Sequence, residues 1–199
     1  MKQTIFVILL LSVSQVGYSQ DSISAFGSVV IFKPPDSTSW NLVQRGMDEE
    51  THKYVIMYKH NPINDAGGRS IEPVVAVLCE EISEPMEIIK YSLWKRQQVS
   101  FTVNGILSKY TQELSYWNAI GYEGEYSKDD IVHKILIGHF RHKRLGAQII
   151  CDSTEGVYDK VDRDMRAFLK SVSFTDEARP ASGNGETLDL TTTHSAYIC

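Results

Sequence analysis

The sequence has little cysteine, little proline and no excess of basic residues. Its 199 residues include three cysteines and six prolines, too few for a disulfide-stapled scaffold or a proline-rich disordered chain. The 20 basic and 25 acidic residues give a net charge of −5, which disfavours nucleic acid or an anionic membrane as a partner. Nucleotide-binding loops and nucleophile elbows are also missing from the sequence. What remains, 42% hydrophobic and 10% aromatic residues, is the composition of one ordinary folded domain.

The one long apolar run lies at the start of the chain. Lys2 precedes the apolar segment 5–11, and the small residues Gly17 and Ser19 stand before Gln20. This arrangement is typical of a secretory signal peptide, and the run falls short of the roughly 20 apolar residues that a membrane-spanning helix needs. We therefore expect cleavage after residue 19. The protein is then exported to the periplasm or the extracellular space, with no stable membrane insertion afterwards.

The rest of the chain divides into a domain, residues 20–174, and a tail, residues 175–199. The tail is rich in Thr, Ser, Gly and acidic residues and has few apolar ones. Such a composition cannot bury enough apolar surface to fold. We expect it to be a flexible acidic tail.

Export changes the interpretation of the cysteines, because an oxidising compartment permits disulfides. Cys79, Cys151 and Cys199 allow three single pairings, each of which leaves one thiol over. Cys79 and Cys151 share strand parity with apolar neighbours and are expected to point into the core. Two buried thiols and a Cys79–Cys151 bridge both remain open, since the separation of the Cα atoms decides between them.

The apolar pattern predicts strands, a helix, a three-stranded meander and a closing helix. The first helix is expected over 84–97, with Ile82, Met86, Ile89 and Leu93 as its core-facing stripe at helical spacing. The order of elements favours an α+β fold with helices packed on a mainly antiparallel sheet. The second helix is expected to begin near residue 154. Its apolar face is expected to consist of Val157, Val161, Met165, Phe168 and Val172. The strands are expected at 27–32, 42–47, 54–58, 74–82, 116–126, 131–142 and 147–152.

Two segments resemble PsbP-like domains. The opening 26–35, Phe-Gly-Ser-Val-Val-Ile-Phe-Lys-Pro-Pro, followed by Trp40, is similar to the aromatic strand, prolines and tryptophan that begin such domains. The closing helix from Tyr158 to the Ser-Phe at Phe174 is similar to their final helix. The resemblance covers roughly residues 26–174, although the segment 100–115 has no counterpart.

The PsbP-like superfamily includes extrinsic proteins of the oxygen-evolving complex, a Ran-binding nuclear-import factor and many small exported bacterial proteins. The resemblance implies an α/β/α sandwich and a non-catalytic role in protein binding. It transfers no catalytic residue and no cofactor to this sequence, because the matching residues are packing residues and a fold alone does not define a function.

Three histidines, His133, His139 and His142, suggest a metal or small-ligand site, since neutral imidazole binds zinc well. His133 and His139 share one strand face but stand about 20 Å apart on an extended strand. His142 points to the other face. A solvated strand face is the alternative interpretation, and a ligand site beside His133 and His139 is the alternative function.

A basic hairpin tip, Arg141, His142, Lys143 and Arg144, stands out in an acidic protein. Its arginines can make bidentate contacts to an acidic partner or an anion, whereas charged hairpin ends also serve simply to keep sheet edges soluble. Glu123 and Glu125 share a strand face, but exposed strand acids are common. We expect an exported, non-catalytic binding protein whose partner the sequence does not identify.

Overall fold

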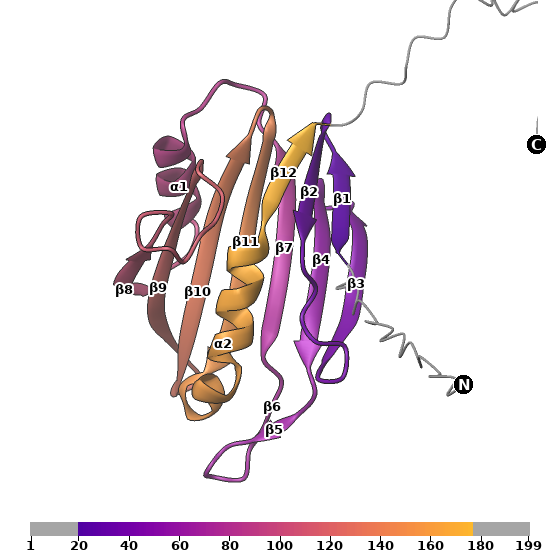
Figure 1. The fold of residues 1–199 in the computed structure, drawn as a ribbon. Coiled ribbons are helices and arrows are strands. Elements are labelled where there is room, and N and C mark those ends of the chain that lie inside the picture. The colour runs from indigo at the N-terminus through magenta and orange to yellow at the C-terminus, as the bar shows by residue number, and fades with distance from the viewer. Residues whose placement is uncertain (1–19, 177–199) are drawn as a thin grey trace, which may run out of the picture.

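A computed structural model describes residues 20–176 of the chain (Figure 1). The predicted signal peptide and residues 177–199 of the predicted tail lie outside this range. The helices are α1 (Ile88–Arg96) and α2 (Glu155–Ser171). The strands are β1 (Asp21–Ala25), β2 (Ser28–Phe32), β3 (Trp40–Asp48), β4 (Lys53–His60), β5 (Ile63–Asn64), β6 (Ser70–Ile71), β7 (Val74–Glu81), β8 (Thr102–Leu107), β9 (Ala119–Lys128), β10 (Ile131–His142), β11 (Leu145–Thr154) and β12 (Ser173–Asp176).

Seven antiparallel strands form the main sheet, in the order β3-β4-β7-β11-β10-β9-β8. The predicted meander β9–β10–β11 forms its long central part. A second, three-stranded sheet has the order β1-β2-β12, and β5 and β6 form a short hairpin. The predicted α+β class with a mainly antiparallel sheet is therefore confirmed.

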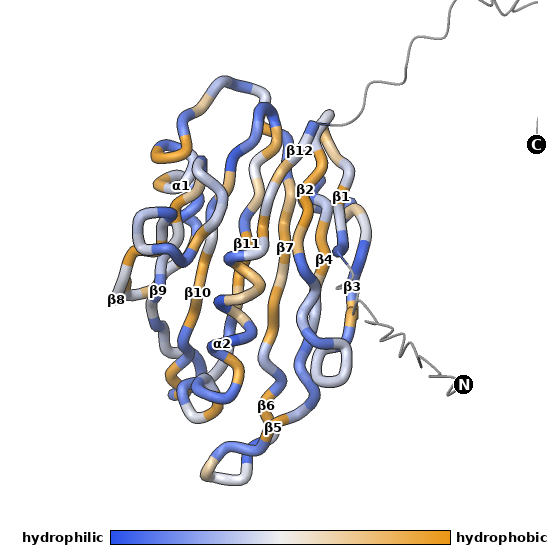
Figure 2. Tube along the Cα trace, viewed as in Figure 1, coloured by the Kyte–Doolittle hydropathy of each residue, from blue (hydrophilic) through white to orange (hydrophobic). Residues whose placement is uncertain are grey.

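The apolar core lies between the main sheet and a layer formed by α2 and the three-stranded sheet (Figure 1). Phe168 of α2 is 2% exposed and packs against Phe32 of β2, with ring centroids 5.3 Å apart, and against Tyr58 of β4, at 6.2 Å. Hydrophobic segments run through β7 and β10 of the main sheet and through β2 of the covering layer (Figure 2). The predicted stripe of α2 is buried, as its helical spacing required: Val157, Val161, Met165, Phe168 and Val172.

The two helices lie on opposite faces of the main sheet, as two close approaches show. A Cβ atom added to Gly138 would come within 2.7 Å of Leu169 on α2, whereas its neighbour His139 bonds Ser92 on α1. Successive side chains of a strand point to opposite faces. A Cβ atom at Gly146 would likewise come within 2.8 Å of the Tyr91 ring on α1. The close packing of both helices thus depends on glycine in the strands below.

Helix α1 differs from its prediction in length and in phase. Glu87 is extended, with φ −71° and ψ 155°, so the helix begins only at Ile88. Its buried residues are Tyr91, Ser92 and Lys95, while Ile89 and Leu93 of the predicted core stripe are 57% and 51% exposed. The helical period was predicted correctly, but the face assigned to the core was wrong.

Five of the twelve strands in the described range were not predicted from the sequence: β1, β5, β6, β8 and β12. β8 falls in the segment 100–115, where no strand was expected, and a register shift between Val103 and Gly105 interrupts its pairing with β9. β1 and β12 are short and pair only with β2. Because β12 ends at Asp176, it crosses the boundary expected at residue 174.

The two cysteines within the described range are free thiols buried in the core. Burial raises the pKa of the Cys79 thiol to about 12 and that of Cys151 still further. Both side chains therefore act as small apolar core residues. Neither helix of the described range is long and apolar enough to cross a membrane.

Candidate functional site

A layer of polar side chains is buried between α1 and the main sheet, on the face opposite the apolar core. It joins residues of α1 to residues of β7, β9, β10 and β11. Buried polar groups are costly unless they are hydrogen-bonded, so each partner matters. The layer consists of Glu80, Tyr91, Ser92, Lys95, Tyr122, His139, Arg141 and Gln148.

His139 is at the centre of this layer and is 1% exposed. Its Nε2 lies 3.1 Å from the Gln148 amide nitrogen and its Nδ1 lies 2.9 Å from Ser92 Oγ. An amide nitrogen can only donate, so Nε2 accepts and the ring proton sits on Nδ1, from which it is donated to Ser92. Ser92 Oγ also lies 2.8 Å from Tyr122 Oη. Burial, and secondarily the charge of Lys95, lower the pKa of His139 to about 4.

The Ser92–His139 pair resembles a nucleophile and its base only in distance. A general base must accept the proton of the serine hydroxyl, whereas here the imidazole donates to Ser92. Ser92 is also 0% exposed, so no substrate reaches its oxygen. This pair holds α1 on the sheet.

A buried ion pair forms the second part of the layer. Lys95 is 2% exposed, and its Nζ lies 2.5 Å from Glu80 Oε1. The Tyr91 hydroxyl donates to the same oxygen at 2.9 Å, and Lys53 Nζ is 4.0 Å from the other oxygen of this carboxylate. Burial lowers the pKa of Lys95, and Glu80 opposes that effect. Both oxygens of the Glu80 carboxylate thus have a partner among these neighbours.

Arg141, predicted to lie on the basic hairpin tip, is instead buried. It is 8% exposed, and its Nε and Nη1 atoms are inaccessible and make no hydrogen bond to a described residue. Strand parity is the reason, because position 141 points to the α1 face, where Tyr91 packs over the opposing residue Gly146.

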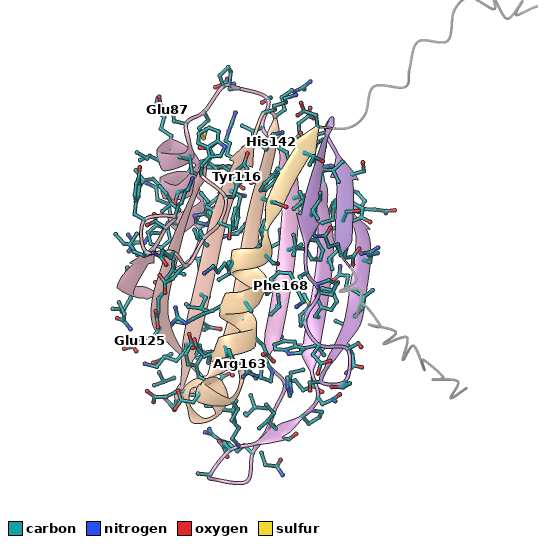
Figure 3. All side chains as sticks on the ribbon, viewed as in Figure 1. Glu87, Tyr116, Glu125, His142, Arg163 and Phe168 are labelled. Atoms are coloured by element: carbon teal, nitrogen blue, oxygen red, sulfur yellow. The ribbon has the colours of Figure 1, made fainter. Side chains whose placement is uncertain are left out.

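The other three residues of the basic hairpin are each paired with an acid. Lys143 Nζ and His142 Nε2 both contact Asp176 Oδ1 of β12, at 2.6 and 2.9 Å, and Arg144 contacts Glu81. His142 Nδ1 also lies 2.8 Å from Tyr116 Oη (Figure 3). The exposed positive charge of the hairpin is therefore smaller than the sequence alone indicated.

His133 and His139 share a strand face, as parity predicted, but the structure does not bring them together. His133 Nδ1 lies 2.7 Å from Asp152 Oδ1 on β11, and its ring stacks on Tyr126 at 4.8 Å. Tyr126 donates to the same carboxylate, and burial together with this bond raises the pKa of Tyr126. Asp152 was missed because cross-strand neighbours cannot be recognised before the register is known. Within residues 20–176, no group of three or more His, Cys, Asp or Glu side chains is placed to hold a metal.

The outer surface of α1 carries three large apolar side chains. Ile89, Leu93 and Trp94 are 57%, 51% and 44% exposed, the reverse of an ordinary surface helix, which buries its apolar stripe. Leu93 also lines a cleft of about 580 Å³ together with Arg96 and Phe101, between the end of α1 and β8. The apolar spacing of α1 is visible in the sequence, but it was interpreted there as a stripe that faces the core.

Comparison with known proteins gives a likeness of fold. No family model matches the chain, and no curated protein is similar to it in sequence. Among solved structures, LpqN, involved in cell envelope biogenesis of Mycobacterium tuberculosis, is 12% identical with a TM-score of 0.55, over 79% of this chain and 91% of that one. The chain shares the fold of LpqN.

A second solved structure similar to the chain is cyanobacterial PsbP (CyanoP) from Synechocystis sp. PCC 6803. It is 13% identical with a TM-score of 0.42, over 84% of this chain and 99% of that one.

Proposed function

We propose that this protein is an exported, non-catalytic accessory protein that binds another protein through the outer face of α1. The observation that carries the proposal is the reversed polarity of this helix. Its apolar residues Ile89, Leu93 and Trp94 face outward, while Ser92 and Lys95 are buried. Exposed apolar surface of this kind is typical of protein interaction sites.

The charges on α1 indicate the kind of partner that would bind there. Helix α1 contains no acidic residue, and its exposed face carries Lys90 beside the apolar side chains, with Arg96 partly exposed at its end. A partner that presents apolar side chains flanked by carboxylates fits this surface. An anionic membrane fits less well, because the whole chain is acidic, with a net charge of −5.

Several features support export and an accessory role. The start of the chain matches a signal peptide, and LpqN, whose fold the chain shares, is involved in cell envelope biogenesis. An α/β/α sandwich is supported by the positions of α1 and α2 on opposite faces of the main sheet. A non-catalytic role is favoured because the nearest equivalent of a nucleophile and base, Ser92 and His139, is buried and has its proton on the histidine.

The test is site-specific crosslinking in cells that produce the full chain. A photo-crosslinking amino acid at position 93, on the outer face of α1, should give one discrete adduct with another protein. The same group at position 42, 50% exposed on the edge strand β3, is the matched control and should give none. Leu93→Asp, with the crosslinker moved to position 89, should abolish the adduct while the circular dichroism spectrum stays that of the wild type.

Other outcomes would overturn the proposal in defined ways. An adduct between two copies of the chain would make α1 a dimer contact, and sedimentation with anionic vesicles would make it a membrane contact. Loss of the adduct in Lys143→Glu/Arg144→Glu, but not in Leu93→Asp, would move the binding surface to the basic hairpin predicted from the sequence.

A further inference from the structure

Strand β8 is an open edge of the main sheet. It pairs with β9 on one side, and within residues 20–176 no strand lies beyond it (Figure 1). Free backbone groups make an edge strand a template for another strand, so exposed edges usually carry charged side chains or proline. β8 has neither, whereas β3 at the opposite edge carries Arg45, which forms an ion pair with Asp21 of β1. β8 is therefore the edge of this sheet that can accept a further strand.

The side of β8 that faces α1 carries exposed apolar surface. Tyr122 of β9 lies on this side, because its hydroxyl is 2.8 Å from Ser92 Oγ of α1. Ile106 is opposite Tyr122 in the register and so shares its face, and it is 63% exposed. The ring of Phe101, just before β8, lies 6.4 Å from the ring of Tyr122. Ile106 and Phe101 are thus neighbours of the same ring at the edge of the sheet.

A cleft of about 580 Å³ extends this surface to the end of α1. Leu93 and Arg96 line the cleft from the helix, and Phe101 lines it from the start of β8. The guanidinium carbon of Arg96 lies 5.7 Å from the centre of the Phe101 ring and 5.5 Å from that of Tyr122, so its charge is held at the cleft. Helix α1 contains no acidic residue. The cleft therefore suits apolar side chains that are accompanied by negative charge.

The chain itself contains a segment with these properties, residues 186–191, Glu-Thr-Leu-Asp-Leu-Thr. It follows the described range. On an extended strand, Leu188 and Leu190 point to the same side, and threonine is favoured in strands. Glu186 and Asp189 provide the negative charge. The composition of the segment therefore fits both the open edge and the cleft beside it.

The segment is also within reach of this edge. The described range ends at Asp176, whose carboxylate lies 2.9 Å from His142 Nε2. Leu107, at the end of β8, is two strands away from Gly138, which precedes His142 by four residues on β10. With about 3.4 Å per residue and 4.8 Å between strands, Asp176 is about 20–25 Å from Leu107. Residues 177–187 span up to about 36 Å when extended, so the tether is long enough.

We propose that residues 186–191 add to β8 as an eighth, antiparallel strand of the main sheet. The backbone of the segment pairs with the free edge, while Leu188 and Leu190 cover Ile106 and enter the cleft. The direction is antiparallel because β8 runs toward the end of the sheet from which the segment arrives. The site borders the outer face of α1 at Leu93. Binding of the segment requires no other protein, so it is tested independently of the proposed function.

The test is hydrogen exchange of the chain 20–199, measured by mass spectrometry on a peptide that covers β8. A tethered segment has an effective concentration of about 1 mM, so with an intrinsic Kd of about 0.1 mM it slows exchange of the outward-facing β8 amides about ten-fold. This slowing should disappear in Leu188→Asp/Leu190→Asp. The matched control, Ser182→Asp/Asn184→Asp, adds the same charge before the segment and should keep it. Exchange of β3, the opposite edge, should be the same in all three chains, and equal exchange of β8 in all three would overturn the proposal.

A photo-crosslinking amino acid at position 190 provides a second measurement. It should form a crosslink within its own chain to a peptide in the range 93–107, whereas the same group at position 182 should not. Ile106→Asp, which changes an exposed side chain, should remove the crosslink. The absence of any crosslink to 93–107 would refute the site. A crosslink that forms only between two chains would also overturn the proposal, because the edge would then take the segment of a second copy.

Discussion

The two faces of the main sheet are buried in different ways. Under α2, the buried side chains are apolar and aromatic, and they gain stability from removal of surface from water. Under α1, charged and hydrogen-bonded side chains are buried beside a few apolar ones such as Ile137, and each of the polar groups depends on a particular partner. One face therefore supplies most of the stability, whereas the other fixes the position of α1 and leaves its apolar residues exposed.

The largest effect is expected from breaking the apolar face. Phe168→Ala removes a ring that contacts Phe32 and Tyr58 in the core, and should lower the free energy of unfolding by about 3–5 kcal/mol. Urea unfolding followed by fluorescence measures the loss. The matched control is Trp94→Ala on the exposed side of α1, which should cost less than about 1 kcal/mol. Equal losses would contradict the division of roles.

Breaking the ion pair of the polar face should have the next largest effect. Glu80→Gln leaves Lys95 as an unpaired buried charge and should cost about 3 kcal/mol in urea unfolding. Replacing both partners, Glu80→Leu with Lys95→Met, should recover most of that loss, because no charge then remains buried. If the double variant is no more stable than the single one, the pair does more than neutralise Lys95.

Acid should weaken the polar face alone. The pKa of His139 is about 4 in the folded protein and about 6.5 when unfolded. The unfolded state therefore binds the extra proton between these values, and stability is complete above pH 6.5 and falls below it. The loss should reach about 2 kcal/mol at pH 5.

The measurement is urea unfolding at a series of pH values from 7.5 to 5. His139→Gln, which can still bond Ser92 and Gln148, should flatten this part of the profile. His52→Asn, at an exposed turn with φ 52°, is the control and should leave it unchanged. A wild-type profile that is already flat would show that His139 is accessible to protons in the folded state.

The smallest effect is expected on the surface of the basic hairpin. Arg144 and Glu81 form an ion pair whose side chains are 67% and 42% exposed. Exposed pairs contribute at most about 1 kcal/mol, and Arg144→Gln should change the stability by less than that. A larger loss in urea unfolding would mean that the hairpin belongs with the polar layer rather than with the surface.

Much of the apolar face could be predicted from the sequence. The stripe of α2 and the meander follow simple periods, 3.6 and 2, and the core obeys them. The resemblance to PsbP-like domains rested on the same packing residues, for example the aromatic strand before Pro34 and the end of α2 at Phe174. The α+β class with a mainly antiparallel sheet was therefore predictable.

The polar face could not be predicted for two physical reasons. Ile89 and Leu93 have the spacing of a core stripe, and nothing local shows that Tyr91, Ser92 and Lys95 bury themselves instead. Lys95 of α1 becomes acceptable in the interior only because strand β7 supplies Glu80. Partners from distant strands, such as Asp152 beside His133, also require the register. Periodicity in a sequence identifies apolar side chains that are buried. It does not identify charged side chains that are buried together with a partner of opposite charge.

The last strand of the described domain has a consequence for the order in which the chain can fold. β12 pairs only with β2, and Ser173 is opposite Ile31, about 140 positions earlier. The layer that covers the core is therefore incomplete until nearly the whole domain has been synthesised. Contacts that span such a long separation form slowly, because the loop between them must close first. The layer formed by β1, β2 and β12 is accordingly the last part of the described domain that can be completed.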